Sequence, residues 1–136
     1  MPTLKKSIKD FLEEAMNNVV ALDIDDAKKI VADDDVQFVD VRDPNEWTSS
    51  GVIKNAVGAS RGMLEFMADP DSPYYNKAFD QNKRLVLYCA KGPRSALAAW
   101  CLKQMGFDNV CYLNGGLNAW MSAGEETTHY ADTSES

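Results

Sequence analysis

The sequence predicts an α/β domain with a mostly parallel central sheet that is flanked by helices on both faces. One observation behind this prediction is the alternation of short apolar runs, such as residues 36–41 and 84–88, with segments of helical periodicity. The other is the size and composition of the chain, which has 136 residues of which 45% are hydrophobic. That is enough for one domain with its own core and too little for two separate lobes.

The first helix is expected near the N-terminus, where apolar residues recur at helical spacing and share one face. These residues are Ile8, Phe11, Leu12, Ala15, Met16 and Val19. We interpret residues 1–18 as an amphipathic helix that packs on a single domain formed by residues 19–124. A dimer contact and a membrane-surface helix are the alternatives, although the mixed charges of the polar face suit water better than lipid headgroups.

Helix and strand patterns alternate from there to residue 67. Asp25 is placed to cap a short helix, and Gly51 is placed to end a later one that begins near Asp43. The expected elements are a helix over 26–31, a buried strand over 36–41, a helix over 43–51, a short strand over 57–59 and a helical turn over 61–67.

The second half begins with residues 69–83, which hold two prolines and many polar side chains and predict a long surface excursion with a short helix at 74–79. The elements expected after it are a strand over 84–88, a helix over 95–105, a strand over 110–113 and a helix over 117–122. Residues 125–136 contain four acidic residues and no Lys or Arg, which predicts a mobile acidic tail.

Charge and cysteine content narrow the function. The net charge of -7 argues against a nucleic-acid partner, since phosphate backbones attract basic surfaces. Three cysteines, no apolar run after the N-terminal lysines and no stretch long enough to cross a bilayer favour a reduced cytoplasmic protein with no membrane contact. His129 is the single histidine, which argues against His-based metal sites and against a Cys–His catalytic pair. No metal site and no cofactor are expected.

Cys89 is the candidate nucleophile. It follows the strand over 84–88, and the loop after it leads into a helix N-terminus. Ligands of parallel α/β sheets bind beyond the carboxyl ends of strands, and a helix N-terminus favours anions, including a thiolate. Lys91 and Arg94 add positive charge close to the sulfur. By contrast, Cys101 and Cys111 lie within a helix and a strand and are expected to be core residues.

At this loop the chain resembles the rhodanese-type sulfurtransferases, through the run Cys89-Ala90-Lys91-Gly92-Pro93-Arg94-Ser95-Ala96. Three further segments resemble the family's signatures in the same order along the chain. They are Val39-Asp40-Val41-Arg42-Asp43 with Glu46-Trp47, Arg61-Gly62-Met63-Leu64-Glu65-Phe66, and Leu113-Asn114-Gly115-Gly116-Leu117 with Ala119-Trp120. The resemblance covers roughly residues 20–124, and the N-terminal helix is similar to that of bacterial single-domain members.

The resemblance implies a sulfurtransferase in which Cys89 takes a sulfur from a small anionic donor, such as thiosulfate, and becomes a persulfide. Cyanide, or a small or protein thiol, would then accept that sulfur. The loop N–H groups would hold the persulfide or the donor oxyanion, and the residues concerned are Ala90, Lys91, Gly92, Arg94 and Ser95. Pro93 has no N–H to offer and stiffens the loop.

Supporting roles fall to Asp40, Arg42 and Arg61. Asp40 ends a buried strand near the loop, while Arg42 is expected to form a structural ion pair with Glu46. Arg61 faces either the pocket or the surface. The chain departs from the family at Gly51-Val52-Ile53-Lys54-Asn55-Ala56, where many members have His after the Gly and Pro-Gly before the Ala. That departure concerns the shape of a turn and not the nucleophile.

Two other functions compete with this interpretation. A phosphatase or arsenate reductase of the related fold needs five residues between its Cys and Arg, whereas four separate Cys89 from Arg94. A non-catalytic binding or regulatory module would keep the fold without the chemistry, but such modules commonly lose the cysteine that this chain retains. The sulfurtransferase interpretation is therefore preferred.

Overall fold

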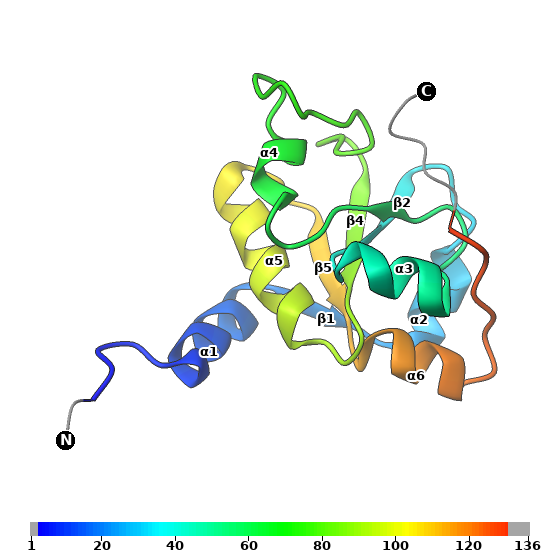
Figure 1. Cartoon of the computed structure of the whole chain (residues 1–136), viewed down its shortest axis with the longest axis horizontal. Helices are drawn as coiled ribbons and strands as arrows, with labels where there is room; N and C mark the ends of the chain where they lie inside the picture. The colour runs from blue at the N-terminus through cyan, green and yellow to red at the C-terminus, as the bar shows by residue number, and fades with distance from the viewer. Residues whose placement is uncertain (1–2, 131–136) are drawn as a thin grey trace.

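The computed structural model describes residues 3–130. Its centre is a five-stranded sheet with the strand order β1-β5-β4-β2-β3, in which every neighbouring pair is parallel. From one edge to the other, the strands are β1 (Val20–Leu22), β5 (Val110–Leu113), β4 (Arg84–Tyr88), β2 (Val36–Asp40) and β3 (Val57–Gly58). Because all strands run the same way, their carboxyl ends meet at one edge of the molecule (Figure 1).

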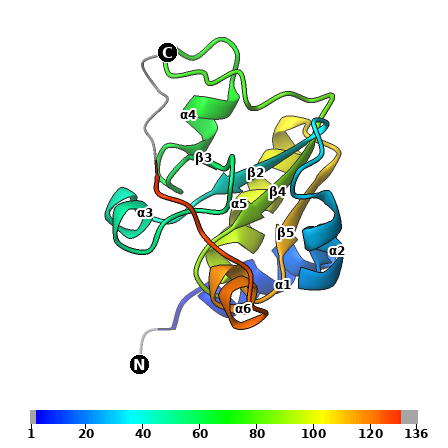
Figure 2. The same ribbon diagram turned by 90° about the vertical axis from the view of Figure 1, so that its right-hand side faces the viewer.

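Helices cover both faces of this sheet, as expected for a parallel sheet (Figures 1 and 2). The helices are α1 (Ile8–Asn18), α2 (Ile24–Ile30), α3 (Pro44–Ser50), α4 (Leu64–Ala68), α5 (Pro93–Met105) and α6 (Gly116–Ser122). One face is covered by α1, α4 and α5, and the other by α2 and α6. No helix within residues 3–130 has the length and apolar character needed to cross a bilayer.

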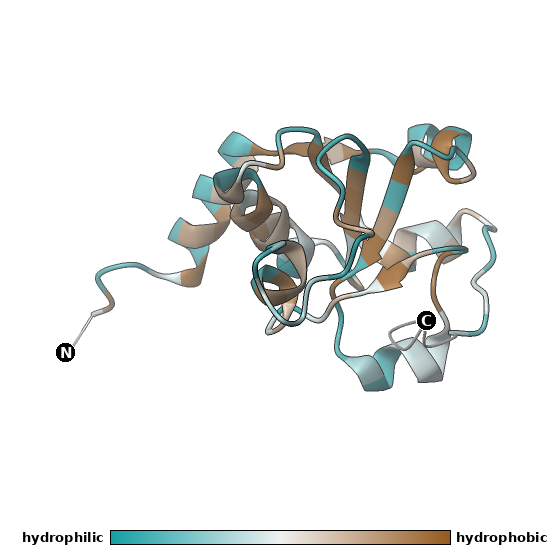
Figure 3. Cartoon of the chain, turned by 90° about the horizontal axis from the view of Figure 1, so that it is seen from above, coloured by the Kyte–Doolittle hydropathy of each residue, from teal (hydrophilic) through white to brown (hydrophobic). Residues whose placement is uncertain are grey.

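Two apolar clusters, one on each face, form the core. The α5 side includes Leu85 and Leu87 of β4, and the opposite side includes Val86 and Tyr88 of the same strand. Successive side chains of a strand point to opposite faces, which is why β4 is apolar at nearly every position. Brown, the colour of hydrophobic residues, is prominent in the strands of the sheet (Figure 3). β4 is therefore the central strand, and the residue that follows it is held firmly.

α1, expected within residues 1–18, begins at Ile8 and packs against α5. Ser7 caps it in a capping box with Asp10, which satisfies free N–H groups of the first turn. Ala15 is buried, and the indole of Trp100 donates a hydrogen bond of 3.0 Å to Glu14. The apolar stripe is only partly covered, however, because Ile8 at the start of the helix is 63% exposed.

Several expected boundaries shift, and two elements differ. β1 was not expected, because three residues directly after a helix give no separate pattern. The short helix expected at 74–79 does not form; turns stabilised by side chains such as those of Ser72 and Asn76 take its place. The helix expected over 95–105 begins earlier, at Pro93, since proline suits the first turn of a helix.

Residues 125–130 contact the domain, which corrects the expectation of a mobile tail for this part of the chain. Thr128 and Val52 exchange two backbone hydrogen bonds of 2.7 and 2.9 Å. The indole of Trp120 donates to the carbonyl of Glu126 at 3.1 Å, and the ring of Tyr130 lies 5.0 Å from that of Trp47. Backbone pairing holds this segment although its own apolar content is low. Residues 131–136 lie outside the described part of the chain.

Candidate active site

Cys89 lies directly after β4, at the carboxyl edge of the sheet, as the sequence predicts. Its Sγ accepts a hydrogen bond from the backbone N–H of Gly92 at 3.0 Å and lies 3.6 Å from the Oγ of Ser95. Cys89 is only 1% exposed, so the sulfur is more enclosed than an open loop would leave it.

The loop from Cys89 to Ser95 curls into the first turn of α5. Gly92 is the N-cap residue and has a φ of 126°, which L side chains rarely adopt. Its carbonyl accepts from the hydroxyl of Ser95 at 2.7 Å and from the N–H of Ala96 at 3.0 Å. Pro93 occupies the first turn, where its missing N–H leaves no helix hydrogen bond unmade. The sulfur thus faces the positive end of a 13-residue helix.

The first turn of α6 holds this loop in place through backbone hydrogen bonds. The N–H groups of Leu117 and Asn118 donate to the carbonyls of Cys89 and Ala90 at 2.8 and 3.0 Å. Gly116 lies so close that an added Cβ would meet both carbonyl oxygens at 2.6 Å. These residues were expected only as part of a family signature and not as part of the site. The signal was present in Gly115-Gly116, since paired glycines often mark a close backbone approach.

Arg94 does not lie free beside the sulfur, because Glu46 of α3 holds its guanidinium. Two hydrogen bonds of 2.9 and 3.1 Å join the two side chains in a bidentate pair. This contact lowers the pKa of Glu46 to about 2 and raises the pKa of Arg94. Lys91 is exposed and belongs to no ion pair found among residues 3–130. The loop therefore presents less net positive charge than its sequence implies.

The expected Arg42–Glu46 ion pair is wrong, since Arg42 pairs with Asp40 instead. Both side chains are buried, and the guanidinium donates to both oxygens of Asp40 at 2.7 to 3.1 Å. It also donates to the Oγ of Ser50 and the carbonyl of Gly51, both at 2.7 Å. Arg42 can reach these groups because the chain reverses after β2. The buried pair joins β2 to the end of α3 and so positions the helix that carries Glu46.

The remaining candidates are Arg61 and the other two cysteines. Arg61 donates to Glu65 at 2.8 Å in a partly exposed pair. This pair lies beside Cys101. Cys101 was expected to be a core residue, but it is only half-buried. Cys111 is buried, as expected, and burial raises the pKa of its thiol. Among the described residues, no group of three His, Cys, Asp or Glu side chains could hold a metal ion.

A parallel α/β sheet with a cysteine at the carboxyl end of its central strand, ahead of a glycine-bent loop and a long helix, defines a cysteine-loop domain of the rhodanese or phosphatase type. Residues 23–123 match the rhodanese-like domain family, and the chain belongs to this family.

Curated relatives have several functions. Thiosulfate sulfurtransferase GlpE of Pseudoalteromonas translucida is 30% identical over 93 residues, which are 68% of this chain and 80% of that protein. A tRNA uridine(34) hydroxylase of Staphylococcus aureus is 31% identical over 106 residues, or 77% of this chain and 32% of the relative. This chain thus spans about a third of the hydroxylase, and about a fifth of the adenylyltransferase/sulfurtransferase MoeZ of Mycobacterium tuberculosis.

Solved structures include similar chains of nearly the same extent. A Rhodopseudomonas palustris protein described as of unknown function, and as a possible tyrosine phosphatase, is 41% identical with a TM-score of 0.88, covering 94% of this chain and 99% of its own. The polysulfide-sulfur transferase homodimer of Wolinella succinogenes is 28% identical with a TM-score of 0.70, covering 92% and 89%. The fold and the extent of the domain are shared with both.

Proposed function

We propose that this protein is a sulfurtransferase that carries a sulfane sulfur as a persulfide on Cys89. The observation that carries the proposal is the placement of Sγ, which accepts the Gly92 N–H at 3.0 Å where α5 begins. A helix N-terminus stabilises a negatively charged sulfur without a histidine base. The match to GlpE over 80% of its length supports the same reaction class.

The reaction would proceed in two steps on one sulfur atom. The Cys89 thiolate attacks the sulfane sulfur of the donor, so a new S–S bond forms while the S–S bond of the donor breaks. With thiosulfate as donor, sulfite leaves with the electron pair. Cyanide or a thiolate then attacks the outer sulfur, and the pair of electrons in the enzyme's S–S bond returns to Cys89. No external oxidant or reductant is needed.

The loop would supply the groups that hold the charge. Gly92 already donates to Sγ, and the other candidates in the loop are the backbone N–H groups of Ala90, Lys91, Arg94 and Ser95. The hydroxyl of Ser95 donates to Gly92 in this state and lies close enough to turn toward a charged sulfur. Asp40 and Arg42 would act indirectly, because their ion pair holds α3 and therefore Glu46 in place.

The charge of the site favours particular donors. Because Glu46 occupies Arg94, a thiosulfate dianion meets a weaker positive field than the loop sequence suggests. Donors with a single charge at the reacting end, such as a persulfide of a small thiol or of a protein, lose less from this arrangement. We therefore propose thiol persulfides as the better donors and thiols as the acceptors, in a reducing compartment such as the cytoplasm where the free cysteines persist.

Intact mass spectrometry tests the proposal. The protein is incubated with thiosulfate, or with a small-molecule persulfide, and then with cyanide. We expect a gain of one sulfur atom, its loss with cyanide, and neither change in Cys89→Ala. Sulfur uptake that persists in this variant would overturn the assignment of Cys89. The same preparation is assayed with para-nitrophenyl phosphate, because turnover there without sulfur uptake would assign the phosphatase chemistry instead.

A further inference from the structure

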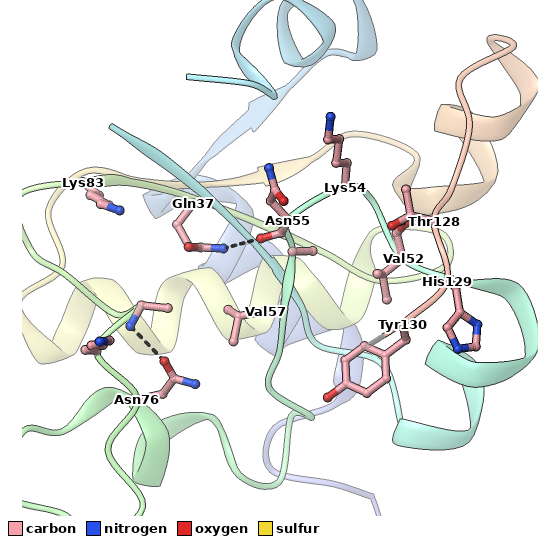
Figure 4. Close-up of a pocket in the computed structure, with 13 residues that line it drawn as sticks. Gln37, Val52, Lys54, Asn55, Val57, Asn76, Lys83, Thr128, His129 and Tyr130 are labelled. Atoms are coloured by element: carbon pink, nitrogen blue, oxygen red, sulfur yellow. Dashed lines mark hydrogen bonds between the residues drawn. The ribbon is translucent and has the colours of Figure 1, made fainter. Parts of the chain in front are cut away.

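A pocket lies between the β2–β3 side of the sheet and residues 128–130, and the proposed sulfur chemistry does not use it. It has a volume of about 750 Å³, within the usual range for small-molecule sites. Three parts of the chain form its walls: the region of β2 and β3, the excursion near Asn76, and residues 128–130 (Figure 4). The docking of Thr128 on Val52 closes one side of it.

The pocket concentrates positive charge in an acidic protein. Its lining includes Lys54, Lys77 and Lys83, and no Asp or Glu. The chain as a whole carries a net charge of -7. None of the three lysines belongs to an ion pair found among residues 3–130. In Figure 4, Lys54 and Lys83 lie on opposite sides of the 3.0 Å hydrogen bond from Gln37 to the carbonyl of Asn55.

Neutral polar groups and apolar side chains complete the lining. Asn55 and Asn76 bring side-chain amide groups, which can donate to oxyanions or to a polar ring, whereas the amide of Gln37 already donates to the carbonyls of Phe38 and Asn55. Val52 and Val57 add an apolar wall, on the same side as the ring of Tyr130. A bare inorganic anion would leave this wall unused. The lining fits an organic molecule that carries several negative charges.

This pocket is separate from Cys89. Lys83 precedes β4, whereas Cys89 follows it. A strand of five residues spans about 17 Å, so the two positions lie at opposite ends of the strand. None of the residues that line the pocket belongs to the loop from Cys89 to Ser95, so the two sites can be tested independently.

We propose that this pocket binds a small phosphorylated organic molecule of nucleotide size. The phosphate groups would lie near the three lysines, and the organic group against the apolar wall. Asp33 and Asp34 line a smaller adjoining hollow that shares Lys54 and Lys83 with the pocket. Those two carboxylates oppose an anion, so their charge should weaken binding rather than help it.

Titration calorimetry with ADP and with inorganic pyrophosphate tests the proposal at low ionic strength, where charge effects are least screened. We expect saturable binding of ADP, with weaker binding of pyrophosphate because the apolar wall is not used. Lys54→Gln and Lys83→Gln should each weaken ADP binding about threefold or more. The double variant Asp33→Asn, Asp34→Asn should tighten it.

Matched controls separate this site from general attraction. Lys28→Gln and Lys29→Gln remove lysines of α2 that line neither hollow, and they should leave ADP binding unchanged. On adding ADP, the backbone NMR signals of residues 54–57 should shift, while those of residues 90–92 stay in place. Absence of saturable ADP binding, or equal weakening by the α2 variants, would overturn the proposal. Equally tight binding of pyrophosphate would overturn the part that assigns an organic group.

Discussion

Replacing Glu46 by Gln tests the ion pair that holds Arg94 beside the proposed nucleophile. Glutamine has nearly the same shape, and its side-chain oxygen can still accept the N–H of Asp43, a hydrogen bond that Glu46 makes at 2.9 Å in the capping box of α3. The substitution therefore removes the charge of Glu46 while the helix cap is kept. What changes is the interaction with the guanidinium.

The expected loss of stability follows from the pKa of Glu46, which the structure lowers from 4.5 to about 2, mainly through the hydrogen bonds from Arg94. Such a change corresponds to about 3 kcal/mol at most. The side chains of Arg94 and Glu46 are 40% and 30% exposed, so solvent screens the pair. We therefore expect the variant to lose about 1–2 kcal/mol in free energy of unfolding at pH 7, and about 3–6 °C in Tm.

The direction in which the stabilisation changes with pH follows from the same pKa. Because folding lowers this pKa, the stabilisation is complete above about pH 4.5 and is lost as the pH falls towards 2. Urea unfolding of the parent and of Glu46→Gln should therefore differ most at neutral pH and converge in acid. The control is Glu65→Gln, which removes the carboxylate of the partly exposed Arg61–Glu65 pair.

Activity provides a second measurement on the same variant. Without Glu46 the charge of Arg94 is free, so kcat/KM for thiosulfate should rise about threefold or more, with a steeper dependence on salt. Glu65→Gln should leave kcat/KM unchanged. A stability difference that is the same at pH 7 and at pH 3 would refute the ion-pair argument. A fall in thiosulfate use would show that Arg94 acts only when Glu46 positions it.

Three further predictions concern other parts of the structure. Gly116→Ala places a Cβ 2.6 Å from two carbonyl oxygens of the loop and should cost about 2–4 kcal/mol in urea unfolding, with loss of sulfur uptake; an unaffected variant would contradict the close packing. A chain that ends at Gly124 loses the pairing with Val52 and should be about 2–3 kcal/mol less stable than one that ends at Tyr130; equal Tm values would show that this pairing contributes nothing. Timed thiol labelling with mass readout should modify half-buried Cys101 well before buried Cys111, and the reverse order would overturn their burial.

Much of the sheet and the nucleophile could be predicted because the signals are local. The apolar run before Cys89 has no polar interruption, and the helix after it has a clear start and a glycine at its end. Together they place a thiol at the carboxyl edge of a parallel sheet without any knowledge of tertiary contacts. The enclosure of the sulfur was not predictable in this way, since it depends on how the loop closes over it.

The parts that sequence reasoning missed depend on contacts between distant residues. Glu46 and Arg94 are 48 positions apart, and the nearer Arg42 offered a simpler partner. The ordered segment after Gly124 has few apolar residues, so composition indicated mobility, but its backbone pairs with Val52 from 76 positions away. Pairing of this kind uses main-chain groups that every residue has, and side-chain patterns do not reveal it.

The open edge of the sheet beside β2 affects the tendency of the protein to aggregate at high concentration. β3 pairs only with the last two residues of β2, so the first part of β2 lacks a neighbour on that side. The side chain of Gln37 partly fills this gap by donating to the carbonyls of Phe38 and Asn55 at 2.8 and 3.0 Å. An occupied carbonyl offers a poor template for a strand of another molecule. We therefore expect Gln37 to hinder aggregation through this edge, and expect a valine in its place to leave a β-branched strand without this protection.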